Sequence, residues 1–201
     1  IVLVTGPTGS GKTTTLYSLL QQVNTDDRKI LTVEDPVEYD LDGIVQVPVN
    51  DDIGVNYSRV LRTMLRQDPD IILIGEIRDP ETAQIAVEAA LTGHLVLSTL
   101  HTNDAPSTVT RMVDLGVEPF LLAATLEGIV AQRLLRCVCE HCGVAAVASE
   151  DQRSRLDLEN LEGFTRGQGC EECHFTGYSG RTAIYEILPL DESLKTQFLD
   201  N

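Results

Sequence analysis

A glycine-rich segment near the start of the chain carries the residues best suited to chemistry. Residues 6–13 read GPTGSGKT and match the P-loop pattern G-x-x-x-x-G-K-[ST] at every fixed position. The pattern predicts backbone N–H groups that surround phosphate oxygens, with Lys12 neutralising the β and γ phosphates and Thr13 ligating Mg²⁺. The segment therefore predicts a nucleoside triphosphate site, and its candidate residues are Gly6, Pro7, Thr8, Gly9, Ser10, Gly11, Lys12, Thr13 and Thr14.

Two glutamates follow apolar runs further along the chain. A triphosphate site that hydrolyses its ligand needs carboxylates to hold Mg²⁺ and to orient or deprotonate the attacking water. Glu34 follows residues 30–33, and Glu76 follows residues 71–75. Ligands of open parallel sheets sit at the carboxyl ends of the strands, so both glutamates are expected to face the P-loop. Capping a helix or facing solvent remains the alternative role for each.

Gly75 stands where many P-loop proteins carry an aspartate. The usual magnesium assignment does not transfer unaltered for this reason, and Glu76 is expected to take over part of it. His101 follows the apolar run 95–99, and at a strand end it could contact the γ-phosphate or its water. His94 precedes the same run. A single histidine is more often structural, so the structural and catalytic interpretations of His101 both stay open.

Four of the five cysteines form two C-x-x-C pairs, Cys139 with Cys142 and Cys170 with Cys173. Paired knuckles bring four thiolates within tetrahedral reach, which is typical of a closed structural Zn²⁺ site. Redox thiols and inert cysteines are the alternatives. Residues 143–169 between the pairs exceed a minimal ribbon, so an inserted loop or helix is expected. Cys137 lies outside the pairs, either as an ordinary buried thiol or as a competing ligand.

The elements that must position these residues alternate along the first part of the chain. Continuous apolar runs predict buried strands at residues 1–5, 30–33, 71–74 and 95–99. Helices are expected at 14–23, 57–67, 80–91, 105–115 and 121–135, the third of them capped by Asp79 and closed by Gly93. A return strand is expected at 182–188. The alternation is typical of an α/β fold with a mainly parallel sheet.

The composition of the sequence changes after Arg136, where cysteines, a charge-rich stretch and glycine-rich stretches follow. This change suggests that the chain is divided there. We expect a nucleotide-binding core at 1–136, a small metal-bearing subdomain at 137–180 and a C-terminal segment at 181–201. Because the chain opens directly on the strand before the P-loop, an earlier domain is expected to be missing from it. The formal net charge is −16, from 15 basic and 31 acidic residues, which disfavours nucleic acid as a partner. No apolar run is long enough to suggest a membrane span.

Four motifs in this order resemble the secretion ATPase superfamily, specifically the motors of type II secretion and type IV pilus assembly. The P-loop is the first motif. The aspartate box resembles VEDPVEY at 33–39, the atypical Walker B resembles IGEIRD at 74–79, and the histidine box resembles TGHLVLSTLHT at 92–102. The segments 65–70 and 131–134 also fit. The resemblance covers nearly the whole chain, to about residue 190.

This resemblance implies a RecA-like P-loop ATPase that uses Mg-ATP to drive pseudopilin or pilin assembly. By analogy Glu34 is the hydrolytic base, Glu76 the Mg²⁺ and water carboxylate, and His94 and His101 couple to nucleotide state. Arg62, Arg66, Arg78 and Arg181 resemble arginines that serve subunit contacts or a neighbour's phosphates. Members of this family act as hexamers on the cytoplasmic face of the inner membrane, peripherally, and many carry a Cys₄ zinc subdomain. An N-terminal domain contacts the membrane platform.

Two other functions remain open at this stage. The atypical Walker B also fits a nucleotide-dependent switch or adaptor that binds ATP and scarcely hydrolyses it. A DNA-translocating motor on the same fold is disfavoured by the charge. Between the two secretion machines, the segment 112–120 favours type II secretion over pilus assembly.

Overall fold

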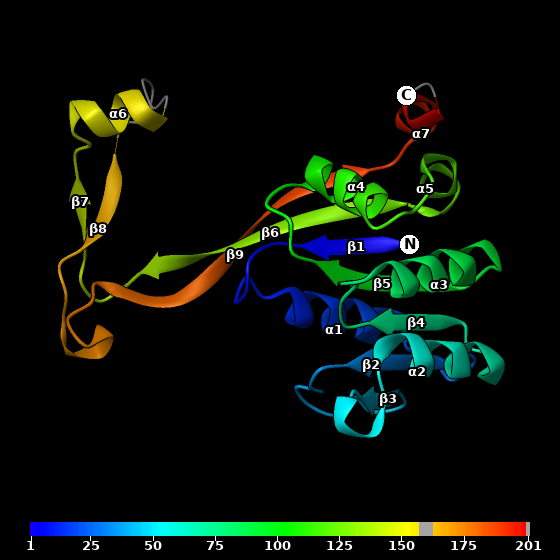
Figure 1. Ribbon diagram of the computed structural model, residues 1–201. Coiled ribbons are helices and arrows are strands. Elements are labelled where there is room, and N and C mark those ends of the chain that lie inside the picture. Colours follow the sequence, from blue (N-terminus) through cyan, green and yellow to red (C-terminus); the bar gives the residue numbers. More distant parts are fainter. Residues whose placement is uncertain (157–162, 200–201) are drawn as a thin grey trace. The chain divides into compact units, whose positions relative to one another are not determined.

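The computed structural model describes residues 1–156 and 163–199, which fall into two compact units (Figure 1). Unit 1 comprises Ile1–Arg133 and the C-terminal segment that starts at Tyr185. Unit 2 comprises Leu134–Ile184 and so includes the segment 137–180. Among the described residues no helix is both long and apolar enough to cross a membrane.

The elements follow one another as a regular alternation in the first unit and as short strands in the second. Unit 1 contains β1 Val2–Thr5, α1 Lys12–Val23, β2 Ile30–Glu34, β3 Val45–Pro48, α2 Tyr57–Met64, β4 Ile71–Ile74, α3 Pro80–Leu91, β5 Leu95–Leu100, α4 Ala105–Asp114, α5 Pro119–Thr125 and α7 Glu192–Leu199. Short 3₁₀ turns lie at Asp51–Ile53, Leu65–Gln67 and Glu171–Cys173. Unit 2 contains β7 Gly143–Ala146, α6 Glu150–Leu156 and β8 Phe164–Gly167, and the strands β6 Gly128–Val138 and β9 Tyr178–Pro189 run through both units.

A seven-stranded sheet in the order β3-β2-β4-β5-β1-β6-β9 organises the larger unit. Five neighbouring pairs are parallel: β2 with β3, β2 with β4, β4 with β5, β5 with β1, and β1 with β6. The chain thus has the α/β fold with a mostly parallel sheet that the sequence predicts. In Figure 1 the arrowheads of β1 and β4 point to the same edge, where the P-loop leaves β1.

Alternate residues of the central strands serve two separate cores, as the period of two in a strand requires. Ile72 and Ile74 of β4 join the core formed with α2, α3, α4 and α5. Ile71 and Leu73 join a smaller core formed with α1 on the opposite face. Both faces of the strand are therefore buried, which explains why its sequence is a continuous apolar run instead of an alternating one.

Helix α3 begins and ends where its sequence signals predict. The Asp79 side chain accepts a hydrogen bond from the Thr82 backbone N–H at 2.9 Å, and Pro80 occupies the first helical position. Gly93 follows the helix with φ +99°, a left-handed conformation that glycine adopts without a Cβ penalty. Helix α3 connects β4 to β5. These signals therefore fix the lengths of the two short connections that contain Glu76, after β4, and His94, before β5.

The prediction of a helix over residues 121–135 is wrong. Helix α5 covers only Pro119–Thr125, and the residues after it form strand β6. The reason is tertiary pairing, since Leu3, Val4 and Thr5 of β1 pair in parallel register with Ile129, Val130 and Ala131. Ile129 and Ala131 point into the large core while Val130 packs against the smaller one, so burial on both faces outweighs the helix propensity of residues 131–135.

Several other elements differ from the expected ones in extent or were not expected. The helix expected to continue to residue 67 ends at Met64 and tightens into a 3₁₀ turn, and the return strand is longer, spanning Tyr178–Pro189. Strands β3, β7 and β8 were missed; β7 pairs with β8 in antiparallel register. The insertion expected between the cysteine pairs contains helix α6, and its residues 157–162 lie outside the described part of the chain.

Candidate functional site

The P-loop connects β1 to α1 and has the geometry of a phosphate cradle. Gly6, Gly9 and Gly11 have φ values of +143°, +77° and +85°, which only glycine adopts freely. A Cβ atom on Gly6 would lie 2.4 Å from the Gln132 carbonyl oxygen, so a larger residue does not fit there. Gly11 is the N-cap of α1 and offers no side chain to cap the helix, which leaves the first-turn N–H groups available to an anion.

Residues of β6 and α1 hold the loop in place. The Gln132 side chain donates a hydrogen bond to the Ser10 carbonyl oxygen at 2.7 Å and accepts one from the Thr15 hydroxyl at 2.7 Å. The Ser10 hydroxyl is buried and has no partner among the described residues, so it is available to a ligand oxygen. The donor set and the backbone conformation thus fit a triphosphate. Gln132 belongs to the segment 131–134 that fits the family pattern, but its contact with the loop was not expected.

Lys12 is buried at the start of α1, with 9% of its surface exposed. Its ammonium donates hydrogen bonds to the carbonyl oxygens of Gly6 at 2.9 Å and Pro7 at 3.1 Å. Burial lowers the pKa of Lys12, and the nearby Glu76 carboxylate opposes that shift. Thr13 is half-buried and Thr14 exposed in the same first turn, while Pro7 and Thr8 form the exposed tip of the loop.

Glu76 lies just beyond the carboxyl end of β4 and is buried. One carboxylate oxygen forms an ion pair with Arg78, and the other lies 3.2 Å from His101 Nε2. His101 follows β5 and keeps half of its side chain exposed. The structure therefore brings Lys12, Glu76 and His101 together at one edge of the sheet.

Glu34 ends β2 and is 3% exposed. Its carboxylate is bound by hydroxyl and amide donors from Tyr17, Thr32 and Gln46. These three partners of Glu34 were not predicted from the sequence. Tyr17 lies at an apolar position of α1, and Gln46 lies in a strand that the sequence did not predict.

Steric crowding explains why position 75 is occupied by glycine. A Cβ atom there would lie 3.1 Å from the Tyr57 hydroxyl and 3.3 Å from both the Glu34 Cα and the Val33 carbonyl oxygen. Burial raises the pKa of Tyr57, with the charges of Glu76 and Asp35 adding to the effect, so the hydroxyl stays protonated beside the carboxylates. The close packing of β4 against β2 and α2 thus disfavours any side chain at position 75, an aspartate included.

We expect Gly75→Ala to lower the free energy of unfolding by about 1–3 kcal/mol, the range for an overpacked site. Urea denaturation followed by circular dichroism measures the change. Gly128→Ala is the matched control, because a Cβ atom at that position would meet its first neighbour, the Leu188 carbonyl oxygen, only at 3.7 Å. Equal losses in the two variants would contradict the steric argument.

His94 lies apart from this edge. His94 precedes β5, and its Nδ1 lies 2.8 Å from the Ala89 carbonyl oxygen at the end of α3. With roughly 3.3 Å per strand residue, it is at the opposite end of β5 from His101. Of the candidate arginines in unit 1, Arg78 contacts a residue of the site, Glu76. Arg62 pairs with Glu81 at 2.6 Å on the outer helices, and Arg181 is exposed in unit 2.

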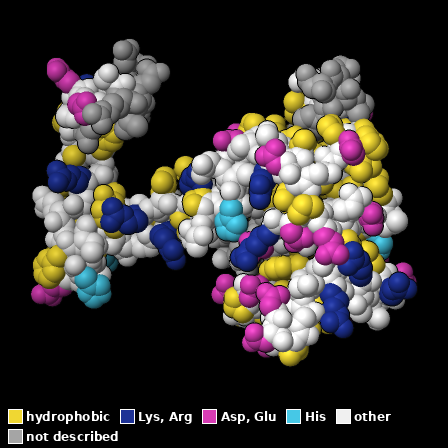
Figure 2. Space-filling model, in the orientation of Figure 1, with side chains coloured by type: hydrophobic (Ala, Val, Ile, Leu, Met, Phe, Trp, Pro, Cys, Tyr) yellow, Lys and Arg dark blue, Asp and Glu magenta, His cyan; other side chains and the backbone are white. Residues whose placement is uncertain are grey.

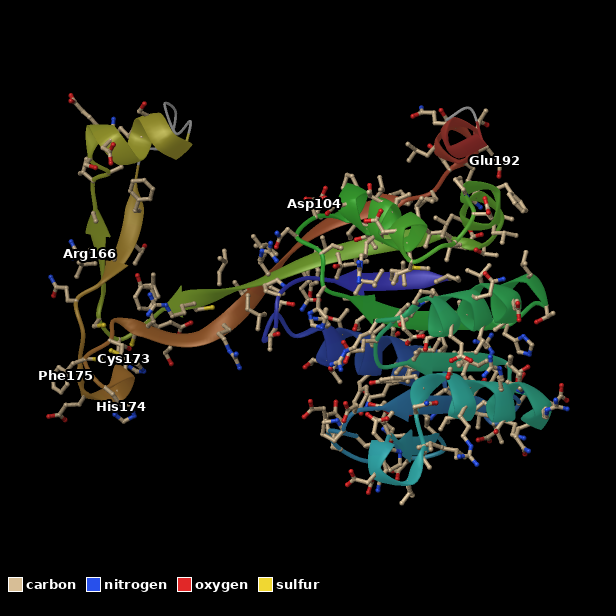
Figure 3. The ribbon with its side chains drawn as sticks, in the orientation of Figure 1. Asp104, Arg166, Cys173, His174, Phe175 and Glu192 are labelled. Carbon is tan, nitrogen blue, oxygen red and sulfur yellow. The ribbon has the colours of Figure 1, made fainter. Side chains whose placement is uncertain are left out.

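Unit 2 brings the two cysteine pairs into one cluster (Figure 3). The four sulfur atoms of Cys139, Cys142, Cys170 and Cys173 lie within 4.8 Å of one another. Three of their separations are 3.9, 3.8 and 3.7 Å. Tetrahedral Zn–S bonds of about 2.3 Å place the sulfurs about 3.8 Å apart, so the cluster has the dimensions of a zinc site. Cys137 is not part of it.

Backbone donors in the cluster favour a thiolate at Cys173, whereas burial raises the pKa of Cys142. The N–H groups of Cys170 and Gly177 each lie 3.2 Å from Cys173 Sγ, and the N–H of Gly169 lies 3.3 Å from Cys142 Sγ. The hydrogen bond from Cys170 is the main cause that lowers the pKa of Cys173 to about 6. The thiolate is the form that binds metal.

Comparison with known proteins places these features in a family. The model of the family described as "Type II/IV secretion system protein" matches residues 1–201. The type II secretion system protein HxcR of Pseudomonas aeruginosa is 59% identical over 195 residues, which cover 97% of this chain and 38% of that protein. The type II secretion system ATPase E of Vibrio cholerae serotype O1 is 54% identical over 197 residues, covering 97% and 39%.

The solved structures include a motor of similar architecture. The crystal structure of the pilus retraction motor PilT with bound ADP has a TM-score of 0.73 and 33% sequence identity, covering 100% of this chain and 50% of that one. The chain spans about two fifths of the length of the curated relatives it matches. With a family model that matches along the full chain and relatives above half identity, this chain belongs to the type II/IV secretion system protein family.

Proposed function

We propose that the chain is the ATP-hydrolysing part of a secretion motor that drives pseudopilin or pilin assembly. The observation that carries the proposal is the meeting of an uncapped P-loop helix, Lys12 and the buried Glu76 at one edge of the sheet. The names of the relatives, among them an ATPase of type II secretion and a motor with bound ADP, support it. The names of the two type II secretion relatives favour type II secretion for this chain.

Each residue of the site has a defined part in this proposal. The loop from Gly6 to Thr14 binds the triphosphate, and Lys12 neutralises its β and γ phosphates. Thr13 and Glu76 hold Mg²⁺, which when bound neutralises charge on the phosphate oxygens. His101 holds the second oxygen of Glu76, and Glu34 accepts a proton from the attacking water. The cysteine cluster holds Zn²⁺ and stabilises unit 2.

We further propose that the full-length protein works as a homo-hexamer on the cytoplasmic face of the inner membrane, attached peripherally. A preceding domain would contact the membrane platform. The four candidate arginines, Arg62, Arg66, Arg78 and Arg181, are all exposed and are available for contacts between subunits. Nucleic acid is not a partner in this proposal, because the chain carries a net charge of −16. On the face shown in Figure 2, the dark blue basic side chains are scattered among magenta acidic ones.

Measurement of Mg²⁺-dependent ATP turnover against protein concentration tests the proposal. We expect activity per chain to rise with concentration in the full-length protein, because a ring motor completes its site between subunits. Lys12→Ala is expected to lower turnover by about 10²–10³-fold, the effect of one lost electrostatic contact.

Two results would overturn the motor function. Tight ATP binding with negligible turnover at every concentration would indicate a nucleotide-dependent switch. A gain in turnover upon addition of DNA, abolished by salt, would indicate a DNA-translocating motor. Retention of full turnover in Lys12→Ala would show that the measured activity does not come from this site.

A further inference from the structure

The Glu34 carboxylate is held by three donors from three different elements. The hydroxyl of Tyr17 in α1 donates to Oε2. The Thr32 hydroxyl of β2 and the Gln46 amide of β3 donate to Oε1 at 2.5 and 3.1 Å. Among the described residues no lysine, arginine or histidine forms an ion pair with this buried side chain. The orientation of Glu34 therefore depends on neutral hydrogen bonds.

The direction of each bond in this cluster is determined. Gln46 Oε1 accepts a hydrogen bond from the Leu41 backbone N–H at 2.6 Å, which fixes the orientation of its amide group. Gln46 Nε2 therefore donates, both to Glu34 and to the Tyr17 hydroxyl oxygen at 3.2 Å. With its oxygen accepting from Gln46, the Tyr17 hydroxyl directs its own proton to Glu34. Burial raises the pKa of Tyr17, and the Glu34 carboxylate adds to it, so the hydroxyl keeps that proton.

Tyr17 also links Glu34 to the P-loop. It lies on α1 five residues after Lys12, which is about 7.5 Å along a helix, and it is fully buried. Its ring packs in a T-shaped arrangement with the ring of Tyr39, and the two ring centroids are 4.8 Å apart. Tyr39 lies in the loop between β2 and β3. A single rigid helix therefore connects the phosphate-binding residues to the donor on Glu34 Oε2.

We propose that Tyr17 is a positioning residue that fixes the orientation of the Glu34 carboxylate relative to the P-loop helix, with Gln46 directing its hydrogen bond. This inference rests on the proposed function, in which Glu34 accepts a proton from water. A carboxylate that loses its donor on Oε2 gains other orientations, and a displacement of about 1 Å at a reacting group costs on the order of 10²-fold in rate.

The test is single-turnover ATP hydrolysis by the full-length protein carrying Tyr17→Phe. We expect the rate constant to fall by about 10–100-fold, with the dissociation constant of ATP unchanged. Tyr39→Phe is the matched control, because it removes a hydroxyl from the same pair of rings, and no hydrogen bond joins that hydroxyl to a described residue. It should hydrolyse ATP at the wild-type rate. Gln46→Met, which keeps the length of the side chain, should fall between wild type and Tyr17→Phe.

A double-mutant cycle with Glu34→Gln separates a positioning role from a structural one. If Tyr17 acts through Glu34, then Tyr17→Phe should have no further effect on the rate in the Glu34→Gln background. An equal loss in both backgrounds, or a wild-type rate for Tyr17→Phe and Gln46→Met, would overturn the positioning role alone. A wild-type rate for Glu34→Gln would instead overturn the assignment of Glu34 in the proposed function, and the positioning role with it.

Discussion

Glu34→Gln is expected to lower the rate constant of ATP hydrolysis by about 10²–10⁴-fold, the usual contribution of a general base. The amide has the size of the carboxylate, so the buried cluster should stay packed. An amide accepts no proton at neutral pH. Binding of ATP through the P-loop should be unaffected, because Glu34 contributes no group to the loop itself.

Phosphate release and the affinity for a fluorescent ATP analogue measure the two effects separately. Glu38→Gln is the matched control, since Glu38 belongs to the same acidic segment but is exposed. It should hydrolyse ATP at close to the wild-type rate. If Glu34→Gln weakened nucleotide binding as much as it slowed hydrolysis, Glu34 would be a binding or folding residue instead of a base.

Lys12→Ala is expected to differ from Glu34→Gln in its effect on ATP binding. Lys12 contacts the loop and is expected to stabilise the phosphates in both ground and transition states, so its removal should weaken binding as well as slow turnover. Glu34→Gln should act on turnover alone. The two variants therefore distinguish the residue that binds the phosphates from the one that acts on water.

The fold was predictable wherever burial leaves a local signature. Strand β4 is an uninterrupted apolar run because both of its faces pack against helices, and α3 carries its own start and stop residues. The error at residues 121–135 arose because the pairing of β6 with β1 joins residues more than a hundred positions apart. No local pattern contains that information. Strand β3 was missed because it is an edge strand whose inward Gln46 interrupts the apolar pattern.

The site was predictable at its charged groups and not in the residues that hold them. The P-loop pattern and the apolar runs correctly placed Lys12 at the start of a helix and Glu34 and Glu76 at strand ends, where the carboxyl ends of parallel strands meet. The hydrogen bonds of Glu34 with Tyr17 and Gln46 depend on how α1 and β3 pack beside β2, which spacing alone does not reveal. The same holds for the contact between Gln132 and Ser10.

Cys173→Ser is expected to abolish zinc binding and to unfold unit 2. Cys173 is buried, its sulfur is one of four that lie within 4.8 Å of one another, and two backbone N–H groups donate to it. Structural zinc contributes about 10–16 kcal/mol of binding free energy in small zinc domains, which equals or exceeds the total stability of many domains. Unit 2 includes only residues 134–184, so it has few apolar contacts to replace that contribution.

Zinc content by mass spectrometry and limited proteolysis test this expectation together. The wild-type protein should carry one zinc per chain, and Cys173→Ser should carry none and be cleaved rapidly within unit 2. Cys137→Ser is the matched control, because Cys137 lies on β6 outside the cluster, and it should keep both the metal and the resistance to protease. Nucleotide binding should survive in both variants, since every residue of the P-loop site belongs to unit 1. A Cys173→Ser protein that kept its zinc would contradict the role of Cys173 as a ligand, and a metal-free wild type with an intact unit 2 would show that packing alone holds this unit together.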